Sequence, residues 1–277
     1  MQPTTLESIL EQLGEGKVVP YLGSGVLRLD KNCPIPSTPE ALVAKLVAKS
    51  SVPHKLLKSL TGAAQFIENF KHRKTLVTGM NEAFRVSATP NALHEFLADI
   101  RPPMIVHAWY DDLARKAFAG KEDWGSVQGA SQSEHFGEWT RWYDPMGALA
   151  DAVVGETWTT LLYEPVGSIA PASNFLVSDT DYVEFLTEID IQTPVPDKVK
   201  DLRKGRHFLY LGCRFNTQLD RILAHQISKR SSDKHWAVLP DPPTRNELRF
   251  LEEHGIERIE LPLEDFAAQL MGAAAFG

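Results

Sequence analysis

Short apolar runs alternate along the chain with longer segments in which apolar residues recur every three or four positions. A short run predicts a buried strand, and the longer spacing predicts an amphipathic helix. The predicted strands are 18–22, 104–106, 159–163, 175–177, 206–212, 236–239 and 256–261. The predicted helices are 5–13, 38–49, 54–60, 62–70, 73–85, 90–98, 110–118, 179–189, 217–229, 244–254 and 263–271. This alternation predicts an α/β fold with a mostly parallel sheet covered by helices on both faces.

Residues 120–158 depart from this alternation. They hold four of the six tryptophans, Trp124, Trp139, Trp142 and Trp158, among glycine, serine, glutamine and aspartate. So much aromatic surface needs to be packed away from water. We therefore expect a small inserted subdomain or flap that leaves the sheet and packs through Trp139, Trp142 and Trp158. The main domain would then comprise residues 1–119 and 159–277.

The composition is that of a globular protein. Of the 277 residues, 43% are hydrophobic and 23% are charged, which excludes a disordered or fibrous chain. The formal net charge of −7 gives no overall positive field to hold nucleic acid or an anionic membrane, although a local basic patch is compatible with it. No apolar run reaches the roughly 20 residues of a membrane helix. The first five residues lack the pattern of a signal peptide, so we expect a cytoplasmic protein that binds neither nucleic acid nor membrane.

The sequence contains no metal-binding pattern. The two cysteines, Cys33 and Cys213, form no Cys-x-x-Cys pair and cannot build a cysteine zinc site. The nine histidines are scattered without the spacing of metal ligands. We therefore expect no metal centre.

Two glycine turns are the first candidates for ligand binding. Each follows a predicted strand, at 18–22 and at 206–212. Backbone N–H groups in such a turn, together with the positive end of a helix dipole, suit a diphosphate. Because ligands bind outside the carboxyl ends of parallel strands, we expect the two turns to lie within one ligand's length of each other. The candidate residues are Gly23, Ser24, Gly25 and Val26 in the first turn and Gly212, Cys213 and Arg214 in the second.

The turns also have structural interpretations. The third glycine of the dinucleotide fingerprint is absent, because Leu27-Arg28-Leu29 follows the first turn. A Gly-x-Gly pattern taken alone is therefore about as often a structural turn as a phosphate-binding site. Arg214 would pair either with a phosphate or ribose, or with Asp220 or solvent. We expect Cys213 to pack in the interior rather than act as a nucleophile, because the sequence shows no activating partner.

Five ordered segments carry a resemblance that covers nearly the whole chain. They are YLGSGV at 21–26, PSTPEAL at 36–42, AQFIE at 64–68, VSDTDYVEFL at 177–186 and FLYLG at 208–212. Together they resemble the SIR2-like proteins, bacterial relatives of the sirtuins that bind NAD. The resemblance implies a Rossmann-like, doubly wound NAD-binding domain. It also implies cleavage of the nicotinamide–ribose bond, either as NAD hydrolysis or as lysine deacylation.

The catalytic positions are where this sequence departs from the family. The family's Thr-Thr-Asn-x-Asp motif aligns with residues 107–111, in which Asp111 is kept and Trp109 replaces the asparagine. The family's catalytic histidine aligns with Val166, which cannot accept a proton from a ribose hydroxyl. Sirtuin deacylases usually carry a four-cysteine zinc module, which two cysteines cannot build, so deacylation is disfavoured.

Two other side chains are candidates for a relocated base. His107 begins the altered motif, and Asp111 would orient its ring. Glu164 is the second candidate. His94 lies on the predicted helix 90–98 and is expected to be structural.

Three functions are compatible with this pattern. In the first, the chain binds NAD or ADP-ribose through the two turns and Asp111, has a degenerate catalytic site, and acts as a sensor or a partner-binding module. In the second, it is an active NAD glycohydrolase that uses His107 or Glu164. In the third, it is a structural protein without a ligand, and a protein partner or a homo-oligomer is left open. The absence of the family's asparagine and catalytic histidine favours the first function. Binding needs the backbone turns, which are present, whereas cleavage needs the two missing side chains.

Overall fold

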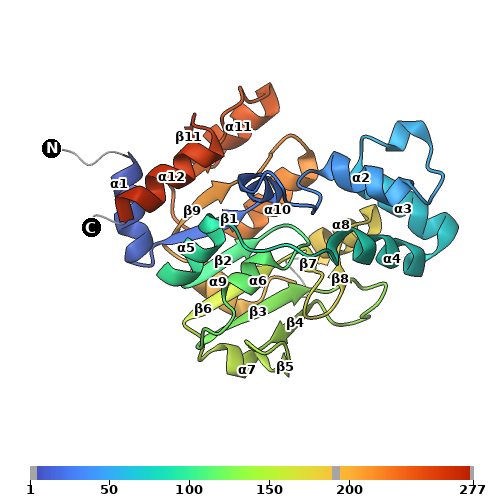
Figure 1. Cartoon of the computed structure of the whole chain (residues 1–277), viewed down its shortest axis with the longest axis horizontal. Helices are drawn as coiled ribbons and strands as arrows, with labels where there is room; N and C mark the ends of the chain where they lie inside the picture. The colour runs from blue at the N-terminus through green and yellow to red at the C-terminus, as the bar shows by residue number, and fades with distance from the viewer. Residues whose placement is uncertain (1–4, 189–193, 275–277) are drawn as a thin grey trace.

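A nine-stranded sheet organises the computed structural model, which describes residues 5–188 and 194–274 (Figure 1). The strand order is β11-β10-β9-β1-β2-β6-β3-β4-β5. The strands are β1 (Val18–Leu22), β2 (Met104–His107), β3 (Trp124–Gly129), β4 (Thr140–Tyr143), β5 (Leu149–Ala150), β6 (Thr160–Glu164), β9 (His207–Leu211), β10 (His235–Val238) and β11 (Ile256–Ile259). Neighbours from β11 to β3 are parallel, and β4 and β5 continue the sheet in antiparallel pairs. The mostly parallel α/β sheet expected from the sequence is confirmed.

The first strand is apolar along its whole length because both faces of the sheet are covered. All five residues of β1 are buried. Side chains alternate between the faces of a strand, so Val19 and Tyr21 enter one hydrophobic core while Val18 and Leu22 enter the other. This two-sided burial explains why such strands are recognisable as continuous apolar runs.

Helices contribute to both cores, as expected. The core of Val18 and Leu22 includes residues of α1 (Thr5–Gly14), α5 (Ala92–Ile100), α6 (Leu113–Ala117) and α12 (Leu263–Ala274). The core of Val19 and Tyr21 includes residues of α2 (Pro39–Val47), α3 (Leu60–Lys71), α4 (Arg73–Phe84), α8 (Asp179–Glu188), α9 (Asp197–Arg203), α10 (Gln218–Ser228) and α11 (Arg245–Glu253). The doubly wound architecture is therefore present.

The order of the strands reverses between β1 and β9. From β1 the chain continues to β2 and then to the strands beyond it, and it later returns to β9 on the other side of β1 before adding β10 and β11. All five residues of β1 pair in register with β9, from Val18 opposite His207 to Leu22 opposite Leu211. Open α/β sheets bind ligands at the carboxyl edge beside such a reversal. The turns after β1 and β9 lie at this edge.

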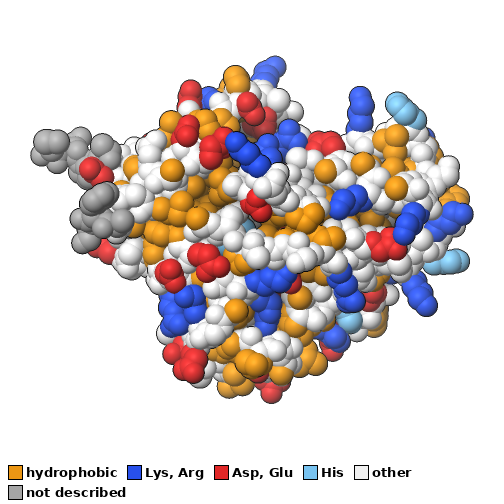
Figure 2. Space-filling view, in the orientation of Figure 1, with side chains coloured by type: hydrophobic (Ala, Val, Ile, Leu, Met, Phe, Trp, Pro, Cys, Tyr) orange, Lys and Arg blue, Asp and Glu red, His pale blue; other side chains and the backbone are white. Residues whose placement is uncertain are grey.

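A basic surface covers the lobe that α2, α3 and α4 form. Residues 39–84, from the start of α2 to the end of α4, contain seven Lys and Arg residues and three acidic residues, Glu40, Glu68 and Glu82. Six of the seven are exposed lysines, and Figure 2 shows Lys and Arg side chains gathered on this lobe. The chain thus has a local positive field despite its net charge of −7.

The expectation that residues 120–158 leave the sheet is wrong. This segment contains β3, which pairs in parallel with β6, and it contains β4 and β5, which extend the same sheet. Gly125 of β3 lies against the ring of Trp158, where an added Cβ would come within 2.3 Å of ring carbons. Trp142 and Trp158 do pack together, with ring centroids 6.1 Å apart. The division of the chain at residues 120 and 158 stays a prediction.

Smaller differences concern helices and connections. The helix expected over 54–60 is a single 3-10 turn, η2 (His54–Leu56), and the helix expected over 110–118 shortens to α6. Residues 197–203 form α9, in a stretch for which no helix was predicted. The strand expected at 175–177 is β8 (Asn174–Phe175), which pairs with β7 (Gly167–Ser168) outside the main sheet.

Two expectations fall partly on residues that the structure does not describe. The absence of a signal pattern was inferred from the first five residues, of which 1–4 lie outside the described residues, and the helix expected over 179–189 ends on another such residue. Among the helices of residues 5–188 and 194–274, none is both long enough and apolar enough to cross a membrane.

Candidate functional site

The two glycine turns are in direct contact. The N–H of Gly25 donates to the carbonyl of Gly212 at 2.9 Å. Gly212 has a φ of +64°, and a Cβ at this residue would lie 2.3 Å from the backbone nitrogen of Val26. Only glycine fits such a position. The expectation that the turns lie within one ligand's length of each other is confirmed.

This contact uses most of the backbone donors that a diphosphate would need. In the first turn, Gly23 donates to Leu211, Gly25 to Gly212, and Val26 back to Gly23. Over the described part of the chain, Ser24 is the residue of this turn whose N–H has no protein acceptor. Three of the four N–H groups at residues 23–26 are therefore already paired, with the carbonyls of Leu211, Gly212 and Gly23, and a role for this turn in phosphate binding stays a prediction. The turn itself is the short 3-10 helix η1 (Ser24–Leu29).

Two cavities meet at the second turn. One has a volume of about 210 Å³ and the other of about 590 Å³. They share the lining residues Gly212, Cys213, Arg214 and Asn216. The larger cavity extends past Arg28 toward the end of β10 and the beginnings of α11 and α12. A ligand that passes from one cavity to the other must therefore cross the two turns.

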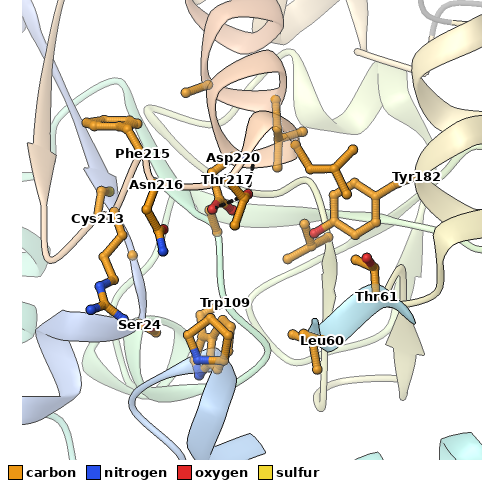
Figure 3. Close-up of a pocket in the computed structure, with 18 of the residues that line it drawn as sticks. Ser24, Leu60, Thr61, Trp109, Tyr182, Cys213, Phe215, Asn216, Thr217 and Asp220 are labelled. Carbon is orange, nitrogen blue, oxygen red and sulfur yellow. Dashed lines mark hydrogen bonds between the residues drawn. The ribbon is translucent and has the colours of Figure 1, made fainter. Parts of the chain in front are cut away.

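The smaller cavity brings together the two positions that depart from the family pattern. Trp109 and Val166 both line it, together with Ser24 of the first turn. Figure 3 shows Trp109 on the opposite side of the cavity from Asp220, with the hydroxyl of Tyr182 turned toward the space between them. The indole N–H of Trp109 donates to the carbonyl of Pro36 at 2.8 Å, which fixes the ring in place.

Sequence reasoning missed part of this cavity. Tyr182 was noticed only as part of a motif, and Asp220 only as a partner for Arg214. In the structure Arg214 pairs instead with Glu40, at 3.4 Å. Asp220 is the third residue after Thr217, the N-cap of α10, and accepts a hydrogen bond from the Thr217 hydroxyl at 2.6 Å. This N-cap spacing is the signal that would have placed Asp220 at the edge of the sheet.

His107 and Asp111 form a buried pair away from both cavities. Nε2 of His107 lies 3.2 Å from Oδ2 of Asp111, and neither residue lines a cavity. Val106 belongs to the core that includes Tyr21 and Trp109, so the next residue of β2, His107, points to the opposite face of the sheet. The geometry thus argues against His107 as a base for a ligand in the cavity, although its catalytic role stays a prediction.

The raised pKa of His107 indicates that its ring is charged and forms an ion pair with Asp111. Burial alone would lower this pKa, but the carboxylates of Asp111 and Glu164 raise it to about 10. Burial would raise the pKa of Asp111, but His107 holds it below its ordinary value of 3.8. Glu164 lies 3.9 Å from Nδ1 of His107, and neither of its carboxylate oxygens has a hydrogen-bond partner among the described residues. His107 is therefore a protonated partner of Asp111 at neutral pH.

The pair should make folding stability fall as the pH rises. The folded pKa of His107 is raised from 6.5 to about 10, so its contribution is complete below pH 6.5 and is lost as the pH rises through about 10. The free energy of unfolding should decline by up to about 1.4 kcal/mol per pH unit from this proton alone. Asp111 acts in the acid range, where its contribution is present above pH 3.8 and is lost as the pH falls through its lowered pKa. Urea unfolding from pH 6 to 10 should show a shallower decline for His107→Gln, and equal slopes would contradict this assignment.

His94 and Cys213 have structural roles. Nδ1 of His94 accepts the N–H of Asn91 at 3.3 Å, which completes the capping box of α5. The Cys213 thiol donates to the carbonyl of Tyr21, and burial raises the pKa of this thiol, so it is a poor nucleophile. Among the described residues, no group of three or more His, Cys, Asp and Glu side chains is arranged to hold a metal ion.

Comparison with protein families identifies the family to which the chain belongs. The family model of the SIR2-like domain matches residues 103–259, from just before β2 to the end of β11. This range is more than half of the chain, and it contains Trp109, Val166 and the second turn. No curated protein matches the sequence significantly. The chain therefore belongs to the SIR2-like domain family.

Proposed function

We propose that this chain binds an ADP-ribosyl nucleotide, NAD or ADP-ribose, without cleaving the nicotinamide–ribose bond and without a zinc module. Membership of the SIR2-like family indicates an NAD-related function. The observation that carries the proposal is that two cavities meet at the turns after β1 and β9, with Trp109 and Val166 in the smaller one. The adenosine would occupy the larger cavity, the diphosphate would lie across the turns, and the distal ribose would enter the smaller cavity.

The charges at the junction support an anionic centre in the ligand. The guanidinium of Arg28 lies beside Gly25, where an added Cβ would be 3.1 Å from it, and Arg28 forms no ion pair within residues 5–188 and 194–274. Arg214 lines both cavities, and its one ion pair in the described part of the chain is with the exposed Glu40. An exposed pair contributes about 0–1 kcal/mol, so a diphosphate would displace Glu40 readily. Lys58, on the basic lobe, also lines the smaller cavity and would attract an anion.

The side chains in the smaller cavity support binding without cleavage. A valine at 166 neither donates nor accepts a proton, and Trp109 cannot replace the amide of asparagine. An active hydrolase that uses His107 or Glu164 would need one of these buried groups to reach the cavity, which neither of them lines. The chain would then act as a nucleotide sensor or as a module that signals to a partner.

Calorimetric titration with ADP-ribose and with NAD tests this proposal. We expect binding of at least one nucleotide, weakened about tenfold or more by Arg28→Ala or Arg214→Ala, because a hydrogen bond to a charged group contributes about 1.5–3 kcal/mol. Arg249→Ala is the matched control, since Arg249 is an exposed arginine paired with Glu253 that lines neither cavity. Absence of binding by both nucleotides would refute the proposal and favour a structural protein without a ligand.

A further inference from the structure

Asp220 is an acidic side chain of the smaller cavity that forms no direct ion pair among the described residues. Its carboxylate accepts from the Thr217 hydroxyl. Two arginines nearby are engaged elsewhere, Arg214 with Glu40 and Arg221 with the carbonyl of Phe215. Burial raises the pKa of Asp220, and the hydrogen bonds from Thr217 and the charges of Arg221 and Arg214 offset this rise only in part. A partly dehydrated carboxylate that no cation contacts directly is costly unless a ligand supplies hydrogen-bond donors.

The walls around Asp220 combine apolar rings with a few polar groups. Tyr21, Trp109 and Phe215 supply the rings. The Tyr182 hydroxyl, the Thr61 hydroxyl and the Asn216 amide are drawn around the same space in Figure 3. Such a mixture binds small neutral ligands in a defined orientation. Acidic side chains accept hydrogen bonds from ribose hydroxyls in other nucleotide sites.

Charge around the cavity favours hydroxyl groups over a cationic ligand. Lys58 and Arg214 line the cavity beside Asp220. The N-terminus of the eleven-residue helix α10, which carries the positive end of the helix dipole, lies at Thr217. These positive groups oppose entry of a cationic ligand. Hydroxyl groups would donate hydrogen bonds to Asp220 without being repelled by these positive groups. The positively charged pyridinium ring of NAD would be repelled by them.

The volume of the smaller cavity favours a sugar over a sugar with a further ring. This volume of about 210 Å³ is below the ~300 Å³ at which pockets for drug-sized ligands begin. Trp109 limits it, because its indole is hydrogen-bonded to Pro36 and packs on Phe84 and Tyr110, with ring centroids 6.0 and 5.1 Å away. Movement of this ring would break all three contacts.

We infer that the smaller cavity binds the free distal ribose of ADP-ribose, with Asp220 as the acceptor for its hydroxyl groups and Trp109 as the residue that excludes the nicotinamide ring. This inference rests on the proposed function and narrows it, because the chain then selects ADP-ribose over NAD. Asp220 and Trp109 are specificity residues for the distal end of the ligand. The adenosine and the diphosphate are held elsewhere.

Titration of the full chain with ADP, ADP-ribose and NAD tests the inference. We expect the parent to bind ADP-ribose about tenfold more tightly than either ADP or NAD, since one charge-assisted hydrogen bond contributes about that factor. Asp220→Asn should remove the advantage of ADP-ribose over ADP. Trp109→Ala should improve NAD binding relative to ADP-ribose. The control is Asp197→Asn, which changes the first-turn carboxylate of α9 outside both cavities and should leave all three affinities unchanged.

The possible outcomes separate this inference from the proposed function. Equal affinities of the parent for ADP and ADP-ribose, or equal losses of both in Asp220→Asn, would overturn the inference while leaving nucleotide binding intact. Tighter binding of NAD than of ADP-ribose by the parent would overturn it as well. Failure of all three nucleotides to bind a folded parent would refute the proposed function itself. Circular dichroism of each variant confirms that the chain remains folded.

Discussion

Nicotinamide release from NAD by the parent chain is expected to stay at background, whereas Val166→His combined with Trp109→Asn should raise it by at least about 10²-fold. A positioned general base typically contributes about 10²- to 10⁴-fold, and misplacement of the ligand by about 1 Å can cost roughly 10²-fold. Both positions line the smaller cavity, so the two new side chains would face the same bound ligand. Replacement of Trp109 also opens the space in which the nicotinamide ring would lie.

The single variants are the controls for this experiment. Val166→His alone should remain inactive because the indole of Trp109 still occupies the ring position, and Trp109→Asn alone should bind NAD without releasing nicotinamide. Release would be followed by chromatography on equal amounts of folded protein. Robust turnover by the parent that disappears in His107→Ala would instead establish the relocated-base hydrolase, and turnover that disappears in Asp220→Asn would identify Asp220 as the base.

Loss of the Asp181 carboxylate should remove about 1–3 kcal/mol from the free energy of unfolding, because buried hydrogen-bond donors lose their acceptor, while Arg73 keeps its pairs with Glu68 and Glu134. The side chain of Asp181 is fully buried and lies 2.8 Å from Nη1 of Arg73. It also accepts from the Ser131 hydroxyl and from the N–H groups of Val177 and Ser178. These contacts join α4, the segment after β3 and the beginning of α8. The free energy of unfolding of a typical domain is only about 5–15 kcal/mol, so this loss would be a sizeable part of it.

Urea unfolding of Asp181→Asn beside Glu134→Gln measures this effect. Glu134 pairs with the same arginine at 3.1 Å, but its side chain is 26% exposed, so its loss should cost less than about 1 kcal/mol. The two variants therefore compare a buried and a partly exposed carboxylate on one guanidinium. Equal destabilisation by both would show that burial of Asp181 does not determine the strength of the pair. Asp181 precedes Tyr182, so a weakened pair should also loosen one wall of the smaller cavity.

The sequence predicted the parts of this structure that depend on local pattern. Strand β1 and its turn were recognisable because a strand buried on both faces must be apolar throughout. Strand β3 was missed because its sequence, WGSVQG, contains small and polar residues whose burial depends on β6, β4 and the ring of Trp158. Helix α9 was missed because it is only seven residues long and buries just Val199 and Arg203.

The site was predicted less completely than the fold. The contact of the two turns follows from the order of the strands, but the use of their N–H groups depends on where the carbonyl of Gly212 points. His107 was a candidate base because it begins the motif that aligns with the family's Thr-Thr-Asn-x-Asp. The alternation of side chains along β2 places His107 on the other face. Asp220 was missed although the N-cap spacing from Thr217 marks the start of α10, because this spacing does not show which residues line the cavity with it.

The hydrogen bond between Gly25 and Gly212 also constrains how the chain folds during synthesis. It joins a turn near the start of the chain to one that follows β9, so most of the protein must be translated before the ligand site can exist. Until β9 emerges, β1 has β2 on one side and an open apolar edge on the other. Unpaired edges of this kind recruit other chains, and pairing between distant segments is slow. Translation products that end before His207 would therefore expose β1 and aggregate, and the nucleotide site would form only in the last stage of folding.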